Sequence, residues 1–204
     1  MDVRALIYDT AILPLTSKWY RRVLDFVPPG ASMLDVGIGT GSALMRNARV
    51  VKAKRLDVVG VDIDADYVKR CQKHIWKEGL GRHVRVFLQS VYDHDGGPYD
   101  AVYFSASFML LPDPAAALHH VSTLLRPGGS IYFTQTFEER RSPVMEQIKP
   151  ILGQLTTIEF GRVTYEADFR SIVEAGGVDL LEMEEIGRSG RRTYRLAVGR
   201  PRTA

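Results

Sequence analysis

The sequence is poor in the features that mark exported or membrane-spanning chains. It holds one cysteine in 204 residues, so no disulfide can form within the chain, as is typical of a reducing compartment. No apolar run approaches the roughly 20 residues that span a bilayer. The first residues, MDVRALIYDTAILPLT, include Asp2 and Asp9 and lack the basic-then-apolar pattern of a signal peptide. These absences predict a cytoplasmic protein.

An excess of charge of one sign is also absent. The formal net charge is +3, and Asp, Glu, Lys and Arg make up 25% of the chain. Such a charge permits an anionic partner without requiring one. The chain has no internal repeat, low-complexity tract or linker, and its length suits one α/β domain with a full core. We therefore predict a single domain over residues 1–204, in which residues 1–30 form an N-terminal cap segment.

Short apolar strands alternate with amphipathic helices along the chain. Each predicted strand is bounded by glycine, proline or polar residues. The predicted helices place apolar residues on one face, as Val68, Cys71 and Ile75 do in the second helix. The predicted strands are Met33–Val36, Asp57–Asp62, Val84–Gln89, Ala101–Ser105 and Ser130–Thr136, and the predicted helices are Ser42–Ala53, Ala65–Glu78 and Pro114–Leu125. This alternation predicts a mainly parallel sheet with right-handed crossovers.

The end of the chain departs from this order. Val178–Ile186 and Thr193–Val198 both have strand patterns, and only Gly187–Arg192 separates them. A parallel crossover needs about a dozen residues or more. The last two strands should therefore be antiparallel to each other.

A glycine-rich segment joins the first predicted strand to the first predicted helix. In Asp35-Val-Gly37-Ile-Gly39-Thr-Gly41 the glycines let the backbone approach a ligand and adopt positive φ. The helix that follows offers unpaired N–H groups, which suit a phosphate or a carboxylate. A dinucleotide fingerprint would have glycines spaced G-x-G-x-x-G, but Ser42 stands at the third position. The observed spacing therefore favours a different ligand modestly.

An acid, Asp62, ends the second predicted strand in Val58-Val-Gly-Val-Asp62. At this place a carboxylate can accept hydrogen bonds from both hydroxyls of a ribose. NAD and S-adenosylmethionine (SAM) both carry such a ribose. Asp62 alone therefore does not distinguish the two cofactors.

Four sequence blocks together narrow the assignment. Asp35–Gly41, Val59–Asp62, Tyr99–Val102 and Leu124–Phe133 follow one another in an order and at a spacing that resemble the class I SAM-dependent methyltransferase family. The resemblance covers the chain from about residue 20 to residue 200. It implies an α/β fold: a Rossmann-like three-layer sandwich with a mainly parallel seven-stranded sheet and an antiparallel last strand.

Within the family the chain resembles small-molecule and lipid methyltransferases. Tyr8-Asp9, upstream of the glycines, and VGIGTG are similar to the ubiquinone/menaquinone type and to bacterial phosphatidylethanolamine methyltransferases. The segment Phe104–Phe108 lacks the Asn/Asp-Pro-Pro-aromatic motif of enzymes that methylate amino groups of DNA bases. The chain also lacks a Pro-Cys pair and the paired-glutamate loop of arginine methyltransferases.

The resemblance implies which residues hold the methionine and ribose portions of SAM, or of its product S-adenosylhomocysteine. Gly37 and Gly39 would line the methionine portion. Asp35 would orient the loop and hold the methionine ammonium through the backbone or a water molecule. Asp62 would bind the ribose.

The resemblance also implies contacts to the adenine and to the transferred methyl group. Ile63 would cover one adenine face, and Ser90 and Val91 would meet its edge. Many relatives have an acid where Ser90 stands, and a hydroxyl is a weaker partner for the adenine amino group. Ser105 would face the transferred methyl.

The N-terminal cap is predicted to close over the cofactor. Trp19–Leu24 is amphipathic, and Tyr8 and Tyr20 would contact SAM there. No catalytic side chain is assigned, because a general base is needed only if the acceptor must lose a proton before attack. Cys71 has a packing role on this interpretation, and the five histidines do not form a metal-ligand set.

Two segments bear on the acceptor. Phe137–Thr164 carries a helical apolar stripe and leaves the carboxyl edge of the sheet, so it could form a lid over an apolar acceptor or pack on the sheet. The loop Gly187–Arg192 holds Arg188, Arg191 and Arg192, and could attract a phosphate-bearing lipid, a membrane surface or RNA, or be a solvated turn.

Three functions remain open on the sequence alone. The first is a methyltransferase that acts on a small-molecule or lipid acceptor, with peripheral membrane contact as an option. The second is an RNA methyltransferase that uses the arginine-rich loop. The third is a SAM-binding protein without turnover. The modest charge and the lack of an appended RNA-binding domain favour the first. The oligomeric state is not predicted.

Overall fold

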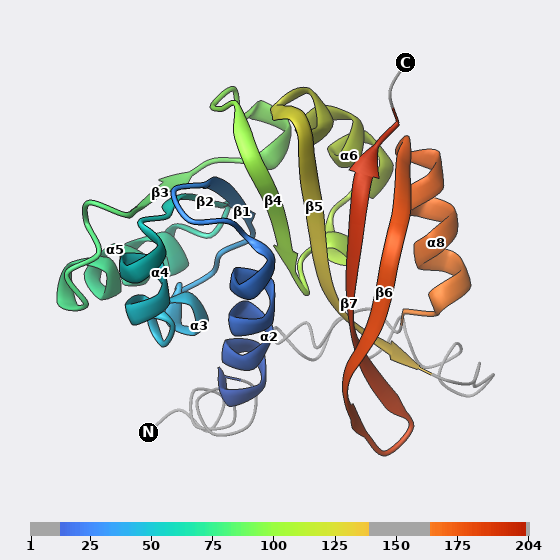
Figure 1. Cartoon of the computed structure of the whole chain (residues 1–204), viewed down its shortest axis with the longest axis horizontal. Helices are drawn as coiled ribbons and strands as arrows, with labels where there is room; N and C mark the ends of the chain where they lie inside the picture. The colour runs from blue at the N-terminus through green and yellow to red at the C-terminus, as the bar shows by residue number, and fades with distance from the viewer. Residues whose placement is uncertain (1–12, 139–163, 203–204) are drawn as a thin grey trace.

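A seven-stranded sheet forms the centre of the computed structural model, which describes residues 13–138 and 164–202 (Figure 1). The strand order is β3-β2-β1-β4-β5-β7-β6. Only β7 is antiparallel to its neighbours, β5 and β6. The strands are β1 (Ser32–Val36), β2 (Asp57–Asp62), β3 (Val84–Leu88), β4 (Tyr99–Ser105), β5 (Leu125–Glu138), β6 (Val178–Ser189) and β7 (Arg192–Pro201). The predicted fold class is confirmed.

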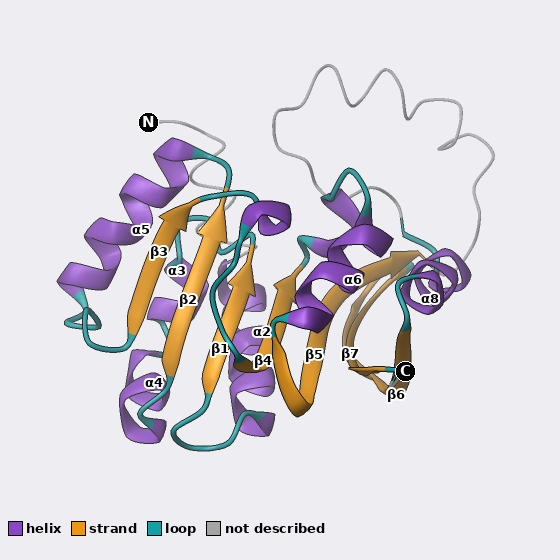
Figure 2. Ribbon diagram, turned by 90° about the horizontal axis from the view of Figure 1, so that it is seen from above, coloured by secondary structure: helices purple, strands orange, loops and turns teal. Residues whose placement is uncertain are grey.

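Helices cover the two faces of this sheet, which makes three layers (Figures 1 and 2). The helices are α2 (Leu13–Phe26), α3 (Ser42–Met45), α4 (Ala48–Lys54), α5 (Ala65–Lys77), α6 (Pro114–Thr123) and α8 (Glu166–Ala175). Short 3-10 turns lie at η2 (Val91–Asp93) and η3 (Phe108–Leu110). Within the described residues, no helix is long and apolar enough to cross a membrane.

Alternation along the strands assigns each side chain to one of two buried clusters. Met33 and Tyr103 pack with α2, α3, α4 and α5, whereas their chain neighbours Leu34 and Phe104 pack with α6 and α8. Because the central strands are buried on both faces, they consist of nearly continuous apolar runs, as parallel strands between helices do. This is the pattern that made them recognisable in the sequence.

The helix predicted over Ser42–Ala53 is wrong in one respect, because it is two helices. The break falls at Arg46-Asn47, between α3 and α4. The Asn47 side-chain amide donates to the carbonyls of Ser17 (2.9 Å) and Ala43 (3.0 Å). Side-chain hydrogen bonds of this kind compete with the regular helix and favour a break. The bond to Ser17 also ties the break to α2.

The last two strands are longer than predicted. β6 runs to Ser189 and β7 begins at Arg192, so the predicted six-residue loop is a two-residue turn of Gly190 and Arg191. Gly190 has φ 58°, which a glycine adopts at no steric cost in a tight hairpin turn. β5 is also longer than Ser130–Thr136, because Leu125 pairs with Tyr99 before an irregularity in the register.

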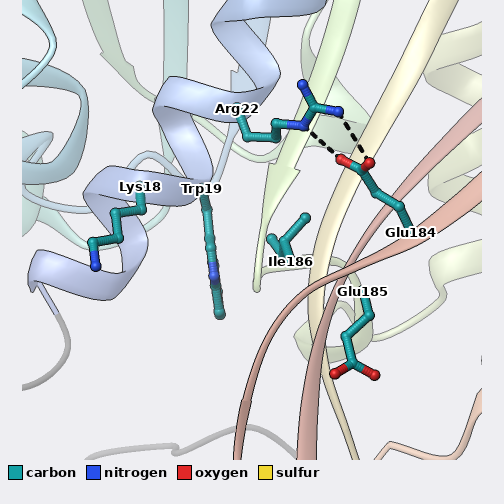
Figure 3. Close-up of a pocket in the computed structure, with 6 residues that line it drawn as sticks. All are labelled: Lys18, Trp19, Arg22, Glu184, Glu185 and Ile186. Carbon is teal, nitrogen blue, oxygen red and sulfur yellow. Dashed lines mark hydrogen bonds and ion pairs between the residues drawn. The ribbon is translucent and has the colours of Figure 1, made fainter.

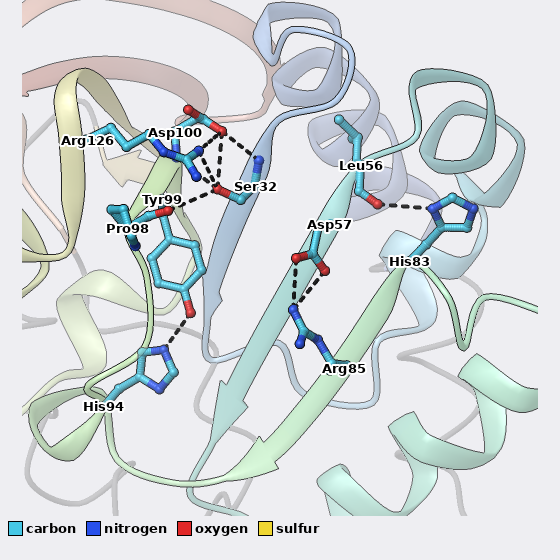
Figure 4. A network of polar contacts seen from close by, with 10 residues as sticks. All are labelled: Ser32, Leu56, Asp57, His83, Arg85, His94, Pro98, Tyr99, Asp100 and Arg126. Atoms are coloured by element: carbon cyan, nitrogen blue, oxygen red, sulfur yellow. Dashed lines mark hydrogen bonds and ion pairs between the residues drawn. The ribbon is translucent and has the colours of Figure 1, made fainter.

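Polar contacts fasten the amino ends of the strands, at the edge opposite the glycine loop (Figure 4). Arg126 reaches Asp100 at 2.6 Å, and the Ser32 N–H donates to the same carboxylate at 2.8 Å. These charge-assisted bonds hold the pKa of Asp100 below its usual value, although partial burial opposes them. Arg85 makes two contacts to Asp57, at 2.9 and 2.8 Å. These contacts therefore join neighbouring strands and have a structural role.

Candidate functional site

The glycine loop sits at the carboxyl ends of β1 and β2. Gly37, Gly39 and Gly41 have φ of 74°, 60° and 67°, which favour glycine at all three positions. A Cβ on Gly37 would lie 2.7 Å from Cβ of Ser107, and one on Gly41 would lie 2.6 Å from Sγ of Cys71. A Cβ on Gly39 would meet nothing within 4 Å. The loop is thus packed at its ends and open at its centre.

Asp62 is the carboxylate that reaches this loop. Its Oδ2 accepts the backbone N–H of Gly39 at 2.8 Å, and its Oδ1 accepts the N–H of Asp64 at 3.0 Å. Each carboxylate oxygen has a second acceptor position, so the two oxygens keep capacity for further donors. The sequence separated these two features by more than 20 residues, and the fold brings them into direct contact.

The position of this contact is typical of a ligand site. The strand order reverses between β1 and β4, since the chain continues outward to β2 and β3 on one side and to β5 on the other. In open α/β sheets, ligands bind outside the carboxyl ends of the strands at such a switch point. The loop between β1 and α3 and the end of β2 both lie at this edge.

Asp35 lies beneath the loop and is fully buried. The hydroxyl of Tyr20, on α2, donates to Asp35 Oδ2 at 2.8 Å. Asp35 Oδ1 is buried and has no hydrogen-bond partner in the structure. Burial raises the pKa of Asp35 to about 7, the Tyr20 hydrogen bond lowers it, and the charge of Asp62 raises it. A free acceptor oxygen on a buried carboxylate suits a cationic donor.

Exposed apolar side chains flank Asp62. Ile63 is 78% exposed and Leu88, which pairs with Asp62 in the β2–β3 register, is 57% exposed. Tyr67, at the start of α5, is 44% exposed. An apolar side chain on each side of a carboxylate could hold a flat ring next to a ribose. Leu88 and Tyr67 were missed in the sequence, because only the strand register brings Leu88 beside Asp62.

The residues predicted at the adenine edge follow β3. Ser90 caps the η2 turn by accepting the N–H of Tyr92 at 3.3 Å. Val91 is 4% exposed and packs in the core with Val59 and Val61. The structure thus places Ser90 at the surface of the turn and Val91 inside it.

The end of β4 supplies Ser105, Ala106 and Ser107. Ser105 is half-buried, as expected for a residue at the end of a central strand. Ala106 has φ 57°, an uncommon conformation for a residue with a side chain. The Ser107 hydroxyl donates to the carbonyl of Val36, so it fastens β4 to the start of the glycine loop. Sequence reasoning had no signal for Ser107, because its partner is a backbone atom of another strand.

Of the two tyrosines predicted to contact SAM from the N-terminal cap, the structure describes Tyr20. Tyr20 is 3% exposed, and its ring packs edge-on against Tyr103 with centroids 4.9 Å apart. Its hydroxyl lies against Asp35, so the structure brings Tyr20 to the site through that carboxylate. Tyr8 lies outside the described residues, as does most of the predicted lid over Phe137–Thr164.

The remaining polar candidates have structural partners. His74 lies on α5, and its Nδ1 is 2.9 Å from the carbonyl oxygen of Thr40 in the glycine loop. Cys71 is buried, in agreement with its predicted packing role, and burial raises the pKa of its thiol to about 12. His94 Nε2 is 2.7 Å from the hydroxyl of Tyr99 (Figure 4). Within the described ranges, His, Cys, Asp and Glu side chains do not gather in a group of three that could hold a metal.

A cavity of about 280 Å³ lies between α2 and β6 (Figure 3). Arg22 and Glu184 face each other there through two hydrogen bonds of 2.6 and 3.0 Å. The residues that line the cavity are Lys18, Trp19, Arg22, Glu184, Glu185 and Ile186. α2 is thereby joined to β6 as well as to the glycine loop.

The arginines of the hairpin are largely neutralised. Arg188 pairs with Glu185 at 2.8 Å, and Arg192 pairs with Glu138 at 2.7 Å. Arg191 occupies the turn itself. An arginine held by a carboxylate is less available to an anionic ligand, so the charge expected at this loop is smaller than the sequence indicated.

Comparison with known proteins agrees with this geometry. A family model described as a methyltransferase domain matches residues 33–129, which hold the glycine loop, Asp62 and the end of β4. Nocamycin O-methyltransferase of Saccharothrix syringae is 36% identical over 137 residues, covering 65% of this chain and 48% of that protein. Ubiquinone biosynthesis O-methyltransferase of Methylococcus capsulatus is 24% identical over 163 residues, covering 78% of this chain and 67% of that protein.

The chain therefore spans about half to two thirds of the length of these curated relatives. The crystal structure of the [4+2]-cyclase SpnF superposes with a TM-score of 0.75 at 16% identity, covering 92% of this chain and 82% of that one. At this identity the likeness concerns the fold. Residues 33–129 thus match a methyltransferase domain, and the seven-stranded sheet with its antiparallel strand agrees with the class I SAM-dependent methyltransferase fold that the sequence resembles.

Proposed function

We propose that the protein binds SAM and transfers its methyl group to a small-molecule acceptor by in-line displacement. The contact between Gly39 and Asp62 is the observation that carries this proposal. It joins a backbone free of side chains to a carboxylate with remaining acceptor capacity, at the switch point of the sheet. The family match over residues 33–129 supports the same cofactor.

The described residues fit the parts of an adenosyl amino acid. Asp62 would accept the ribose hydroxyls, and Ile63 and Leu88 would pack against the adenine. Ser90 and Val91 stay proposed as residues at the adenine edge. The open space at Gly39 would receive the methionine portion. The free Oδ1 of Asp35 would attract the ammonium, and with Asp35 ionised this contact would stabilise the bound state.

When bound, SAM supplies a methyl group on a positively charged sulfur. The protein must then orient the acceptor and exclude water, and orientation alone can contribute about 7–11 kcal/mol. Gly37 and Ser105 lie at the ends of the neighbouring strands β1 and β4, and we assign them to the walls beside the reacting atoms. A side-chain base is needed only if the acceptor must lose a proton.

Isothermal titration with SAM, S-adenosylhomocysteine and NAD tests the cofactor. We expect binding of both SAM compounds and no binding of NAD. Asp62→Ala should weaken SAM binding by about 10- to 100-fold, since hydrogen bonds to a charged group contribute about 1.5–3 kcal/mol. Asp66→Asn removes an exposed acid on α5 and serves as the control. Binding of NAD alone, or full SAM affinity in Asp62→Ala, would contradict the assignment.

Turnover needs its own measurement, because the same fold occurs in a protein named as a [4+2]-cyclase. The relatives named above are O-methyltransferases, which directs an acceptor screen toward small molecules with hydroxyl groups, lipid-like ones included. The expected result is S-adenosylhomocysteine that forms only with an acceptor. SAM binding without any acceptor-dependent product across the screen would favour a protein that binds the cofactor without transferring it.

The domain and location assignments are proposals of the same kind. We infer one domain with a cap over residues 1–30, whose described part, α2, packs on the sheet. The described ion pairs of the hairpin do not favour RNA as the substrate. A cytoplasmic location accords with the reducing compartment that the lone buried Cys71 suits.

A further inference from the structure

The outer faces of α4 and α5 form a cationic surface. Residues 46–55 and 64–78, which comprise these helices and their flanks, hold nine basic and three acidic side chains, a net +6, whereas the whole chain carries +3. The two helices meet near their carboxyl-terminal ends, where Lys52 Nζ donates to the carbonyl of Glu78, which follows α5, at 2.7 Å. The positive charge of the protein is therefore concentrated in one part of one helical layer.

Carboxylates do not neutralise these cations. Eight of them are exposed and form no ion pair within the described residues: Arg46, Arg49, Lys52, Arg55, Lys69, Arg70, Lys73 and Lys77. The arginines that do pair with carboxylates lie elsewhere: Arg21, Arg22, Arg85, Arg126, Arg170, Arg188, Arg192, Arg195 and Arg202. The eight unpaired cations of this surface suit an extended anionic partner.

Trp76 stands on the same helix and indicates the kind of partner. Its side chain is 85% exposed, the largest exposed fraction among the large apolar residues of the described chain. Lys73 and Lys77, one turn before and one residue after it, are both exposed. An indole among flexible cations is typical of a surface that lies against a membrane, where the ring sits at headgroup level and the cations meet anionic lipids.

We propose that the surface formed by α4 and α5 docks the protein on membranes that contain anionic lipids. Proteins that bind single-stranded nucleic acid stack successive bases on several aromatic rings. The outer face of α5 instead offers one indole among lysines, which favours a lipid interface. The inference does not rest on methyl transfer, since it uses no residue of the cofactor site.

Co-sedimentation of the full chain with vesicles tests the proposal. We expect binding to phosphatidylcholine vesicles that contain phosphatidylglycerol, weaker binding as salt rises, and no binding to phosphatidylcholine alone. The Lys73→Gln/Lys77→Gln double variant should lower the partition coefficient about 10- to 30-fold at low salt. Trp76→Ala should lower it about tenfold.

Two further variants keep the test specific. Arg191→Gln/Arg192→Gln removes the same charge from the hairpin and should leave vesicle binding nearly unchanged. Trp19→Phe leaves Trp76 as the only indole of the chain, and its emission should shift to shorter wavelength with anionic vesicles alone. Absence of vesicle binding, an equal loss in the hairpin variant, or binding of single-stranded RNA in place of vesicles would each overturn the proposal.

Discussion

Asp35 is a carboxylate that the fold buries fully, although burial disfavours its charged form. Taking a carboxylate out of water disfavours its charged form, and the Tyr20 hydroxyl offsets only part of that cost. The burial follows from the fold, because Asp35 belongs to a central parallel strand that helices cover on both faces. The fold thus gives Asp35, beneath the glycine loop, a pKa of about 7. A cationic group of a ligand close to this carboxylate would favour its ionised form.

Stability should therefore depend on pH through Asp35. Its pKa rises from 3.8 to about 7 on folding, so the folded state binds a proton that the unfolded state releases between these values. The free energy of unfolding should then fall as pH rises from about 4 to 7, by up to about 4 kcal/mol, and level off above. Urea unfolding at several pH values measures this slope, which Asp35→Asn should remove.

His94 provides an internal check on that comparison. Burial lowers the pKa of His94, so through this residue the free energy of unfolding rises with pH over part of the same range. This contribution is the same in the wild type and in Asp35→Asn. The difference between the two proteins therefore reports Asp35. An unchanged pH dependence in the variant would show that Asp35 does not titrate in this range.

At the scale of elements, α2 connects three parts of the molecule. Tyr20 contacts Asp35 beneath the glycine loop, and Arg22 joins β6 through Glu184. Lys54, at the end of α4, donates to the carbonyls of Leu24, Asp25 and Val27 at 2.5, 3.2 and 2.8 Å. A cation at the carboxyl end of a helix satisfies unpaired carbonyls and complements the helix dipole.

Removal of this cap should destabilise the fold. Lys54→Met keeps the apolar stem and removes three hydrogen bonds from a charged donor, so we expect a loss of about 1–3 kcal/mol in the free energy of unfolding. Lys69→Met changes an exposed lysine of α5 and should alter it by less than about 0.5 kcal/mol. Urea unfolding of both variants makes the measurement, and equal effects would argue against the capping role of Lys54.

At the scale of the whole molecule, the order of the strands creates the site. The reversal between β1 and β4 places the glycine loop, the end of β2 and the end of β4 at one edge of the sheet. A ligand that contacts all three would be linked to the folding of most of the sheet. Binding should therefore raise the stability of the entire domain rather than of one segment.

Thermal unfolding can detect this linkage. At a SAM concentration of 100 times Kd the stabilisation is about 2.7 kcal/mol, which for a chain of this size corresponds to a rise in Tm of roughly 5–10 °C. NAD at the same concentration should leave Tm unchanged. A shift with NAD and none with SAM would contradict the proposed cofactor by a method independent of titration calorimetry.

The sequence was most informative where local pattern decides structure. The predicted β1 to β4 agree with the observed strands to within two residues, because short apolar runs between turn residues are sufficient to define buried strands. The break between α3 and α4 was not visible, since it depends on an amide that reaches Ser17 on another helix. The antiparallel pair of β6 and β7 was predicted, but the extension of β6 to Ser189 was missed because Gly187, Arg188 and Ser189 resemble a loop.

Some residues of the candidate site could also be predicted from the sequence, and others could not. Residue types and spacing indicated the glycine loop and Asp62, and their contact agrees with that expectation. Leu88 and Ser107 could not be found in this way, since each is brought to the site only by strand pairing or by a bond to a distant backbone atom. The ion pair of Arg192 with Glu138 likewise joins segments 54 residues apart in the chain, whereas Arg188 pairs with Glu185 only three residues away.

By itself the sequence determined the class of fold, the first strand–loop–helix unit and the acid that faces it, because these depend on periodicity and on the conformational freedom of glycine over a few residues. Tertiary structure alone decided the burial of Asp35, the partner of Tyr20 and which cations remain free. The reason is physical: burial and charge pairing depend on distances between segments, and only the packed sheet and its helical layers set those distances.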